Sequence, residues 1–430
     1  MKVLVIGGGG REHAVIYALR KSPRVTEVIC APGNGGIAQL ARCIPADPGN
    51  LHELINIAVI EQPDLTIVGP ELPLSLGLVD ELRARNMRVF GPTKAAAQLE
   101  SSKAFAKTFM QQHDIPTAAY AICDSLDDVR EELPRFTLPV VVKADGLAAG
   151  KGVVICNTHL EAERAAAEMF SGVLLGTEES EVVLEEFLEG EELSFFALCD
   201  GKHAVPIAAA QDHKRIGEGD TGPNTGGMGA YSIDSLLPDD LRDWLNTNVA
   251  QKVIDGMADE GDPFTGILFC GIMMTARGPM VLEFNTRFGD PETQALMMRL
   301  DTDILDLFNA SIDGTADKLS VRMKPGAAVT VVAASANYPG KVVNGKVISG
   351  LAPSDDPHVY VFHSGTALRT NDEGGGEIVT AGGRVLAITA VAADLKTALD
   401  KSYAELAKIS FEGMQFRRDI AWRALKKSQL

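Results

Sequence analysis

The stretch VVVKADGLAAGKGV, residues 140–153, joins a short apolar strand to a glycine-rich turn that carries two lysines. The strand delivers Lys143, and the turn after it presents Lys151. Glycines let a backbone fold closely over phosphate groups, and lysine neutralises them as a point charge. No Ser or Thr follows Lys151, so the turn is not a Walker A loop. The stretch predicts a phosphate-covering hairpin, with an ordinary turn as the alternative.

A second polar cluster, LEFNTRFGDPE at residues 282–292, directly follows a strand-like run. Successive side chains of a strand alternate between faces, which places Glu283 and Asn285 on the same face about 7 Å apart. Two hard oxygen ligands on one face suit Mg²⁺. Glu-x-Asn pairs also occur on solvated strands, but the crowding of polar groups here favours a metal and anion site.

The first hundred residues alternate strand and helix patterns, which predicts a parallel α/β sheet. The expected strands and helices are Lys2–Ile6, Glu12–Lys21, Val25–Ala31, Leu51–Glu61, Leu65–Val68, Leu76–Arg85 and Arg88–Phe90. Ligands of such sheets bind at the carboxyl ends of the strands. We therefore look for function in the loops Gly7–Gly10 and 69–74.

The Gly7–Gly10 turn opens a helix, and exposed N–H groups at a helix start favour an anion. A dinucleotide fold would need a third glycine at position 12 or 13, where Glu12 and His13 stand, and an acid after the second strand. That strand instead runs into residues 30–34, CAPGN. We expect a mononucleotide-like phosphate site, while a turn that only packs helix on strand stays open.

Two further segments are informative. VVLEEFLEGEELS, residues 182–194, reads as a strand end and a charged turn that could offer backbone groups to a flat base and a carboxylate to ribose. Residues 212–231 contain six glycines and few apolar side chains. A loop of that length inside a folded enzyme is usually a functional lid or disordered. We expect residues 212–231 to be a loop.

Composition narrows the classes of protein. A chain of 430 residues with 46% apolar residues suits two to four domains. A net charge of −18 argues against binding to nucleic acid or an anionic membrane. Six scattered cysteines without a CxxC pair suggest reduced thiols. No stretch is apolar enough for a signal peptide or membrane span, so we expect a cytoplasmic protein. No long exposed apolar helix suggests an obligate partner, so we also expect a monomer.

The motifs, in their order and separations, resemble the ATP-grasp superfamily and within it the phosphoribosylamine–glycine ligases. The blocks that carry the resemblance are GGGGREHA (7–14), VGPELPL (68–74), SSKAF (101–105), the lysine hairpin, EEFLEGEELS (185–194), QDHKRIGEGDTGPNTGGMGAY (211–231), LEFNTRFGDPE, HSGTAL (363–368) and AGGRVLAIT (381–389). The resemblance implies an N-terminal parallel-sheet, Rossmann-like domain (1–101), a two-lobed α+β ATP-grasp domain (102–325, with a mobile small lobe at about 120–192) and a small mixed β C-terminal domain (326–430).

It also implies roles for particular residues. ATP would be bound by Lys103, Lys143, Lys151, Glu186, Leu188 and Glu192, the last through ribose. Catalysis would use Arg287, Asp212 and Lys214. Substrate would be bound by Gly9, Gly10, Pro70, Glu71, Asp290 and Glu292. Magnesium or manganese would be bound by Glu283 and Asn285, whereas Cys270-Gly271 stands where many ATP-grasp enzymes have a further carboxylate.

The implied reaction is the ATP-dependent ligation of glycine to 5-phosphoribosylamine through glycyl phosphate, in purine biosynthesis. The small molecules ATP, glycine and phosphoribosylamine would be the only partners. Two alternatives stay open: another ATP-grasp carboxylate–amine ligase of purine metabolism, and, more remotely, a nicotinamide-dependent oxidoreductase.

Overall fold

A computed structural model describes residues 1–147, 152–173, 181–370 and 376–427. The N-terminal part is a five-stranded parallel sheet of order β3-β2-β1-β4-β5. Its strands are β1 Lys2–Gly7, β2 Glu27–Pro32, β3 Arg42–Cys43, β4 Leu65–Val68 and β5 Val89–Phe90. Its helices are α1 Gly10–Leu19, α2 Leu51–Glu61, α3 Glu71–Leu76 and α4 Leu78–Arg83. The predicted parallel sheet is confirmed.

Strand β1 is buried on both faces, which explains its unbroken apolar run. Val3 and Val5 belong to one core with residues of α1, while Leu4 and Ile6 belong to another with residues of α2 and α4. The helix predicted over Leu76–Arg85 is present as α4, which is shorter at both ends. Gly77 has φ +94°, a left-handed conformation that ends α3 before α4 begins.

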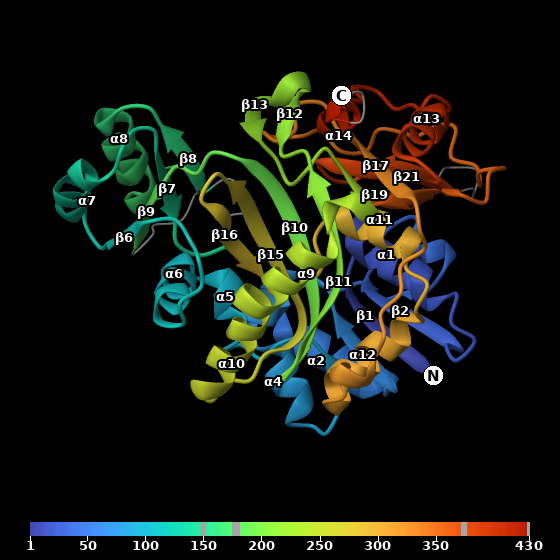
Figure 1. Ribbon diagram of the computed structural model, residues 1–430. Coiled ribbons are helices and arrows are strands. Elements are labelled where there is room, and N and C mark those ends of the chain that lie inside the picture. Colours follow the sequence, from blue (N-terminus) through green and yellow to red (C-terminus); the bar gives the residue numbers. More distant parts are fainter. Residues whose placement is uncertain (148–151, 174–180, 371–375, 428–430) are drawn as a thin grey trace.

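A small lobe stands apart from the rest of the molecule (Figure 1). It is an antiparallel sheet of order β6-β9-β7-β8, with α7 and α8 packed on it. Its elements are β6 Tyr120–Cys123, α7 Leu126–Glu132, β7 Val140–Ala144, β8 Val153–Cys156, α8 His159–Phe170 and β9 Val182–Glu186. The predicted α+β lobe is therefore confirmed, and the predicted turn at Lys151 lies outside the described residues.

One eight-stranded sheet forms the centre of the molecule, in the order β16-β15-β10-β11-β14-β17-β21-β18. Its strands are β10 Glu191–Asp200, β11 Ala204–Asp212, β14 Gly229–Ile233, β15 Thr265–Thr275, β16 Gly278–Asn285, β17 Ala327–Ala334, β18 Val359–His363 and β21 Arg384–Ala392. Pairing of β14 with β17 joins the large lobe to the C-terminal part. The sheet is therefore continuous across residue 325.

Helices cover this sheet and connect it to its neighbours (Figure 1). They are α5 Gln98–Ser101, α6 Lys103–Gln112, α9 Asp239–Leu245, α10 Gln251–Asp259, α11 Glu292–Arg299, α12 Ile304–Asp313, α13 Leu395–Leu406 and α14 Trp422–Lys427. A two-stranded hairpin of β19 Thr366–Thr370 and β20 Gly376–Thr380 was not predicted. Among the described residues, no helix combines the length and apolar character that crossing a membrane requires.

The prediction of a plain loop at residues 212–231 is wrong. The segment folds into a hairpin of β12 Arg215–Gly217 and β13 Thr221–Asn224, followed by β14. Gly219, Gly222 and Gly227 all have positive φ angles, so glycine is used here for turns. The abundance of glycine concealed these short strands, because it weakens the alternation by which strands are identified.

Three buried histidines are expected to make the folded protein less stable in acid. Burial lowers the pKa of His13 to about 3 and those of His213 and His363 to about 4. Each stays neutral in the folded state but gains a proton on unfolding below its ordinary pKa of about 6.5, so stability present above pH 6.5 is lost as pH falls. At pH 5.5 each histidine lowers the free energy of unfolding by about 1.4 kcal/mol relative to pH 8, and the three together lower it by about 4 kcal/mol.

Urea unfolding at pH 8 and pH 5.5 measures this difference. His13 Nδ1 accepts the backbone N–H of His363 at 2.8 Å, and an asparagine oxygen offers a similar acceptor. His13→Asn is therefore expected to remove about a third of the acid loss. An unchanged dependence on pH in His13→Asn would contradict the assignment.

Candidate active site

Strand β16 presents its polar side chains toward Lys214, and Lys143 of the small lobe contacts the same strand at the carbonyl of Leu282. We call the region that these residues share the cleft. Phe284, Thr286 and Phe288 are buried at 2–4% exposure, whereas Glu283 and Asn285 on the other face are partly exposed. The expected alternation of buried and partly exposed side chains along β16 is thus present. Glu283 is 40% exposed, and across the sheet it faces Gly271, which has no side chain. A carboxylate and an amide reach the same open space, a donor set that suits a hard divalent cation.

Lys214 lies between two of the predicted ligand-binding acids. Its Nζ donates to Glu192 Oε1 and lies 3.6 Å from Glu283 Oε1. Burial acts to lower the pKa of Lys214, but Glu192 and Glu283 outweigh it and raise the pKa well above its usual value. Lys214 is therefore a fixed cation beside the carboxylate predicted to bind metal, and it joins that carboxylate to the one predicted to bind ribose.

Asp212 is in the same group of charges. Burial raises its pKa well above the usual value, Lys214 opposes this, and Glu192 and Glu292 raise it further. Three acids, Glu192, Glu283 and Asp212, thus share the single positive charge of Lys214. A cation with charge +2 near Glu283 would relieve this excess of negative charge, in agreement with a metal site.

A buried ion-pair network lies behind the cleft and was not predicted. Glu185 on β9 forms ion pairs with Lys143 and Lys107, each at 2.8 Å. Lys107 Nζ also donates to Thr117 Oγ1 at 2.8 Å, which in turn donates to the carbonyl of Val281 on β16 at 2.6 Å. The network therefore connects Lys143 of the small lobe to the central sheet. The spacing of Lys103 and Lys107, four residues apart on α6, is the signal that could have indicated it.

Lys107→Met is expected to raise the KM for ATP about 10-fold, the effect of losing one charged hydrogen bond. Without Lys107, Lys143 is the one cation that still pairs with Glu185 among the described residues, and Glu185 competes with phosphate for it. Steady-state kinetics at varied ATP measure this, with Lys107→Arg as the matched control because it keeps the charge. An unchanged KM for ATP in a folded Lys107→Met protein would contradict the coupling.

The other described residues predicted to bind ATP lie around the base of the small lobe. Lys103 Nζ donates to the carbonyl of Gly146 at 2.7 Å. Glu186 uses its side chain in an ion pair with Arg277 at 2.7 Å, so a role in base binding falls to its backbone. Leu188 is 5% exposed and follows directly after β9. These positions agree with a nucleotide held where the two lobes meet.

On the opposite side of the cleft, Arg287 connects β16 to the N-terminal part. It contacts Glu100 at 2.7 Å and Glu71 at 3.5 Å, and Arg11 lies 3.7 Å from Glu71. Burial acts to raise the pKa of Glu71, but Arg287 and Arg11 hold it down at about 2. Arg287 and Glu71 were both predicted site residues, and the structure brings them together. Arg11 and Glu100 were missed, although Arg11 directly follows the predicted Gly10.

The Gly7–Gly10 turn meets carboxylates in this structure. Gly9 N donates to Glu12 Oε2 at 2.7 Å, and Arg11 N donates to Asp290 Oδ2 at 3.2 Å. A side chain at Gly10 would meet the side-chain ends of Ser364 and Gln294, which would have to move to make room for it. Pro70 precedes α3 and lies against the same turn. The predicted substrate residues Gly9, Gly10 and Asp290 thus come together from opposite ends of the chain.

Asp290 is also held by the C-terminal part. Arg384 donates to its backbone carbonyl at 2.5 Å and lies 3.6 Å from its carboxylate. Glu292 is 4% exposed, accepts Ser194 Oγ at 3.1 Å, and has a pKa raised by burial. Arg384 was not predicted, because only the fold brings it near residue 290.

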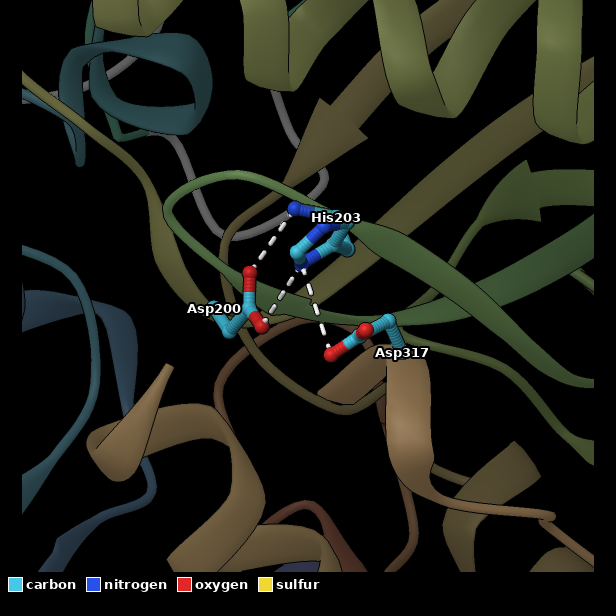
Figure 2. Close-up of side chains that lie close together, drawn as sticks. All are labelled: Asp200, His203 and Asp317. Atoms are coloured by element: carbon cyan, nitrogen blue, oxygen red, sulfur yellow. Dashed lines mark hydrogen bonds and ion pairs between the residues drawn. The ribbon is translucent and has the colours of Figure 1, made fainter. Parts of the chain in front are cut away.

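A separate cluster, Asp200, His203 and Asp317, resembles a metal site only in composition (Figure 2). The Asp200 carboxylate already accepts the backbone N–H groups of Lys202, His203 and Ala316 at 2.7–2.9 Å and contacts His203 Nδ1 at 3.1 Å. Burial acts to raise the pKa of Asp200, and these hydrogen bonds outweigh it and lower the pKa. Asp200 closes the β10–β11 turn, about 30 Å along β10 from its first residues, where Glu192 lies.

A small antiparallel lobe facing a larger sheet across a cleft, with lysines on one side and a Glu-x-Asn strand on the other, defines the ATP-grasp class of enzymes. Family models of phosphoribosylglycinamide synthetase match three segments: the N domain at residues 1–100, the ATP-grasp (A) domain at 101–293 and the C domain at 328–423.

Named relatives agree along the whole length. Phosphoribosylamine–glycine ligase of Xylella fastidiosa strain Temecula1 is 47% identical over 430 residues, covering 99% of each chain. That of Xanthomonas axonopodis pv. citri is 48% identical over 432 residues, covering 100% of this chain and 99% of the relative. The crystal structure of the Thermotoga maritima phosphoribosylamine–glycine ligase has a TM-score of 0.84 at 32% identity, covering 98% of this chain and 100% of that one.

The chain belongs to the phosphoribosylglycinamide synthetase family, whose matched relatives are named phosphoribosylamine–glycine ligase. A biotin carboxylase from Campylobacter jejuni shares the fold, with a TM-score of 0.73 at 14% identity, covering 97% of this chain and 93% of that one. The predicted three-part α/β fold and the predicted family are confirmed. The alternative of a nicotinamide-dependent oxidoreductase is wrong.

Proposed function

We propose that this protein ligates glycine to 5-phosphoribosylamine at the expense of ATP, giving glycinamide ribonucleotide, ADP and phosphate for purine biosynthesis. The observation that carries the proposal is the agreement of all three parts of the chain with ligases of that name. The cleft supports it, because it offers cations and oxygen ligands in place of a nucleophile.

The first step joins a glycine carboxylate oxygen to the γ-phosphorus of ATP and breaks the bond to the β-phosphate oxygen, which releases ADP. Phosphoryl transfer depends on positioning and charge neutralisation. Lys103, Lys143 and Lys151 would bind the phosphates, and Lys214 and Arg287 would stabilise the transferred group. The backbone of Glu186 and Leu188 would meet adenine, and Glu192 the ribose.

Glu283 and Asn285 would hold the divalent cation, magnesium or manganese, which would neutralise charge on the ATP phosphates. The exposed carboxylate and the surplus of acids around Lys214 favour such a cation. Gly271 beside Glu283 offers no further ligand from that position of β15.

In the second step the phosphoribosylamine nitrogen attacks the acyl carbon of glycyl phosphate and phosphate leaves. Little acid or base chemistry is needed, since the acyl phosphate is reactive and the free amine is neutral. Gly9, Gly10, Pro70 and Glu71 would bind phosphoribosylamine. Asp290 and Glu292 would face the glycine ammonium, and Asp212 would position the reactants from the other side.

An ADP-release assay with single omissions tests the proposal. ADP should form only when glycine and phosphoribosylamine are both present, and the amide product should form in equal amount. ADP release with bicarbonate in place of glycine would assign the chain to another carboxylate–amine ligase. The domain limits at 101 and 325, motion of the small lobe, a monomeric state and a cytoplasmic location stay predictions from the sequence.

A further inference from the structure

The hairpin of β12 and β13 is held in place by a segment far from it in sequence, residues 417–427. Arg417 is 0% exposed. Its guanidinium donates to the carbonyl of Arg215 at 3.1 Å and to Asp220 Oδ1 at 2.9 Å, and so spans both ends of the hairpin. Asp419 accepts Arg417 through both carboxylate oxygens at 2.7–2.8 Å, which fixes the plane of the guanidinium.

More contacts join the same two segments. Arg423 donates to Asp220 Oδ2, Gly219 N donates to Asp419 Oδ2 at 2.8 Å, and Ala421 N donates to His213 Nε2 at 2.7 Å. His213 is 1% exposed, and Ala421 is completely buried. The hairpin is thus held at its base, its first strand and its tip by charged or backbone hydrogen bonds.

The base of the hairpin is where it reaches the cleft. Thr225 donates to the carbonyl of Lys214 through both N and Oγ1, at 2.7 and 2.8 Å, and closes the hairpin there. Arg417 contacts the next carbonyl, that of Arg215, and Ala421 contacts the residue before, His213. Lys214 is therefore fixed from both sides while its side chain extends to Glu192 and Glu283.

We propose that Arg417 is a positioning residue: through Arg215 and Asp220 it fastens the β12–β13 hairpin to residues 417–427 and thereby holds Lys214 and Asp212 toward the cleft. The inference rests on the roles proposed above for Lys214 and Asp212. It assigns a part in the reaction to a C-terminal segment that contacts the hairpin and His213.

Asp220→Asn is the sharpest variant. Asp220 has φ +58°, a conformation that asparagine tolerates, and it lies on the hairpin, so no buried site is emptied. The new amide accepts from one arginine and presents N–H to the other. Arg417→Lys is the second variant, since it keeps the charge but loses the forked contact. Asp356→Asn, which weakens a half-exposed ion pair with Lys401, is the matched control.

Two measurements on the full chain decide the proposal. Hydrogen exchange of the 215–224 amides should become about 10-fold faster in Asp220→Asn and Arg417→Lys, and kcat should fall about 10-fold, as for a fractionally populated competent state. The Asp356→Asn control should match the parent. Parent-like exchange, or faster exchange with unchanged kcat, overturns the proposal. Lys214→Met tests the proposed role separately, because full activity there would refute that role whatever the exchange shows.

Discussion

Replacing Glu283 by glutamine is expected to lower kcat by about 10²–10³-fold or more, the effect of removing one preorganised electrostatic group from a transition state. The amide has the shape of the carboxylate but no charge, so the cation that neutralises the phosphates is bound weakly. Folding should be little affected, because Glu283 is 40% exposed. Activity over a range of Mg²⁺ and Mn²⁺ concentrations measures the effect.

The matched control is Glu412→Gln, which affects an ion pair with Lys346 at a carboxylate that is 76% exposed. Binding of Mn²⁺ in the presence of ADP, followed by electron paramagnetic resonance, separates metal loss from other causes. A Glu283→Gln protein that keeps parent activity and parent Mn²⁺ affinity would remove Glu283 from the metal site.

Arg287→Met is expected to lower both activity and stability. We expect kcat to fall about 10²–10³-fold, because a cation close to the transferred phosphoryl group is lost. The change also leaves Glu100, 6% exposed, without its partner at 2.7 Å. Removing one member of a buried pair costs about 3–5 kcal/mol. Steady-state kinetics and urea unfolding measure the two effects.

A second substitution separates them. In Arg287→Met with Glu100→Gln the buried charge is gone, while an amide oxygen can still accept Thr286 N and Oγ1, which now donate to Glu100 at 2.8 and 3.1 Å. Stability should recover and activity should not. If activity returned together with stability, Arg287 would act in folding alone, and its catalytic role would be refuted.

Regular elements with strong apolar patterns were predictable to the residue. The helix Leu51–Glu61 matches the structure because its buried side chains recur at the helical period. The strands Leu65–Val68 and Val153–Cys156 match because each is a short run of apolar and β-branched residues. Strand Ala204–Asp212 was missed because alanines and a proline give it a weak strand signal, although pairing with β10 and β14 makes it central. Tertiary pairing outweighed local preference there.

The candidate site likewise contains some residues that local sequence identifies and others that it does not. Lys143, Glu283, Asn285 and Arg287 lie next to glycine-rich or strand signals, so local sequence identifies them. The residues that complete the site come from distant segments. Lys107 pairs with Glu185 behind Lys143, and Arg384 pairs with Asp290. Residues of opposite charge are common, and a single sequence does not show which of them meet. Only the fold supplies those pairs.

The fate of one oxygen atom tests the account most directly. Glycine labelled with ¹⁸O in its carboxylate should be incubated with the protein, ATP and phosphoribosylamine, and the products identified by mass spectrometry. If a glycine oxygen attacks the γ-phosphate, one ¹⁸O atom must appear in the phosphate released and one must stay in the amide of glycinamide ribonucleotide. Unlabelled phosphate, or ADP formation without that amide, would contradict activation of glycine as glycyl phosphate.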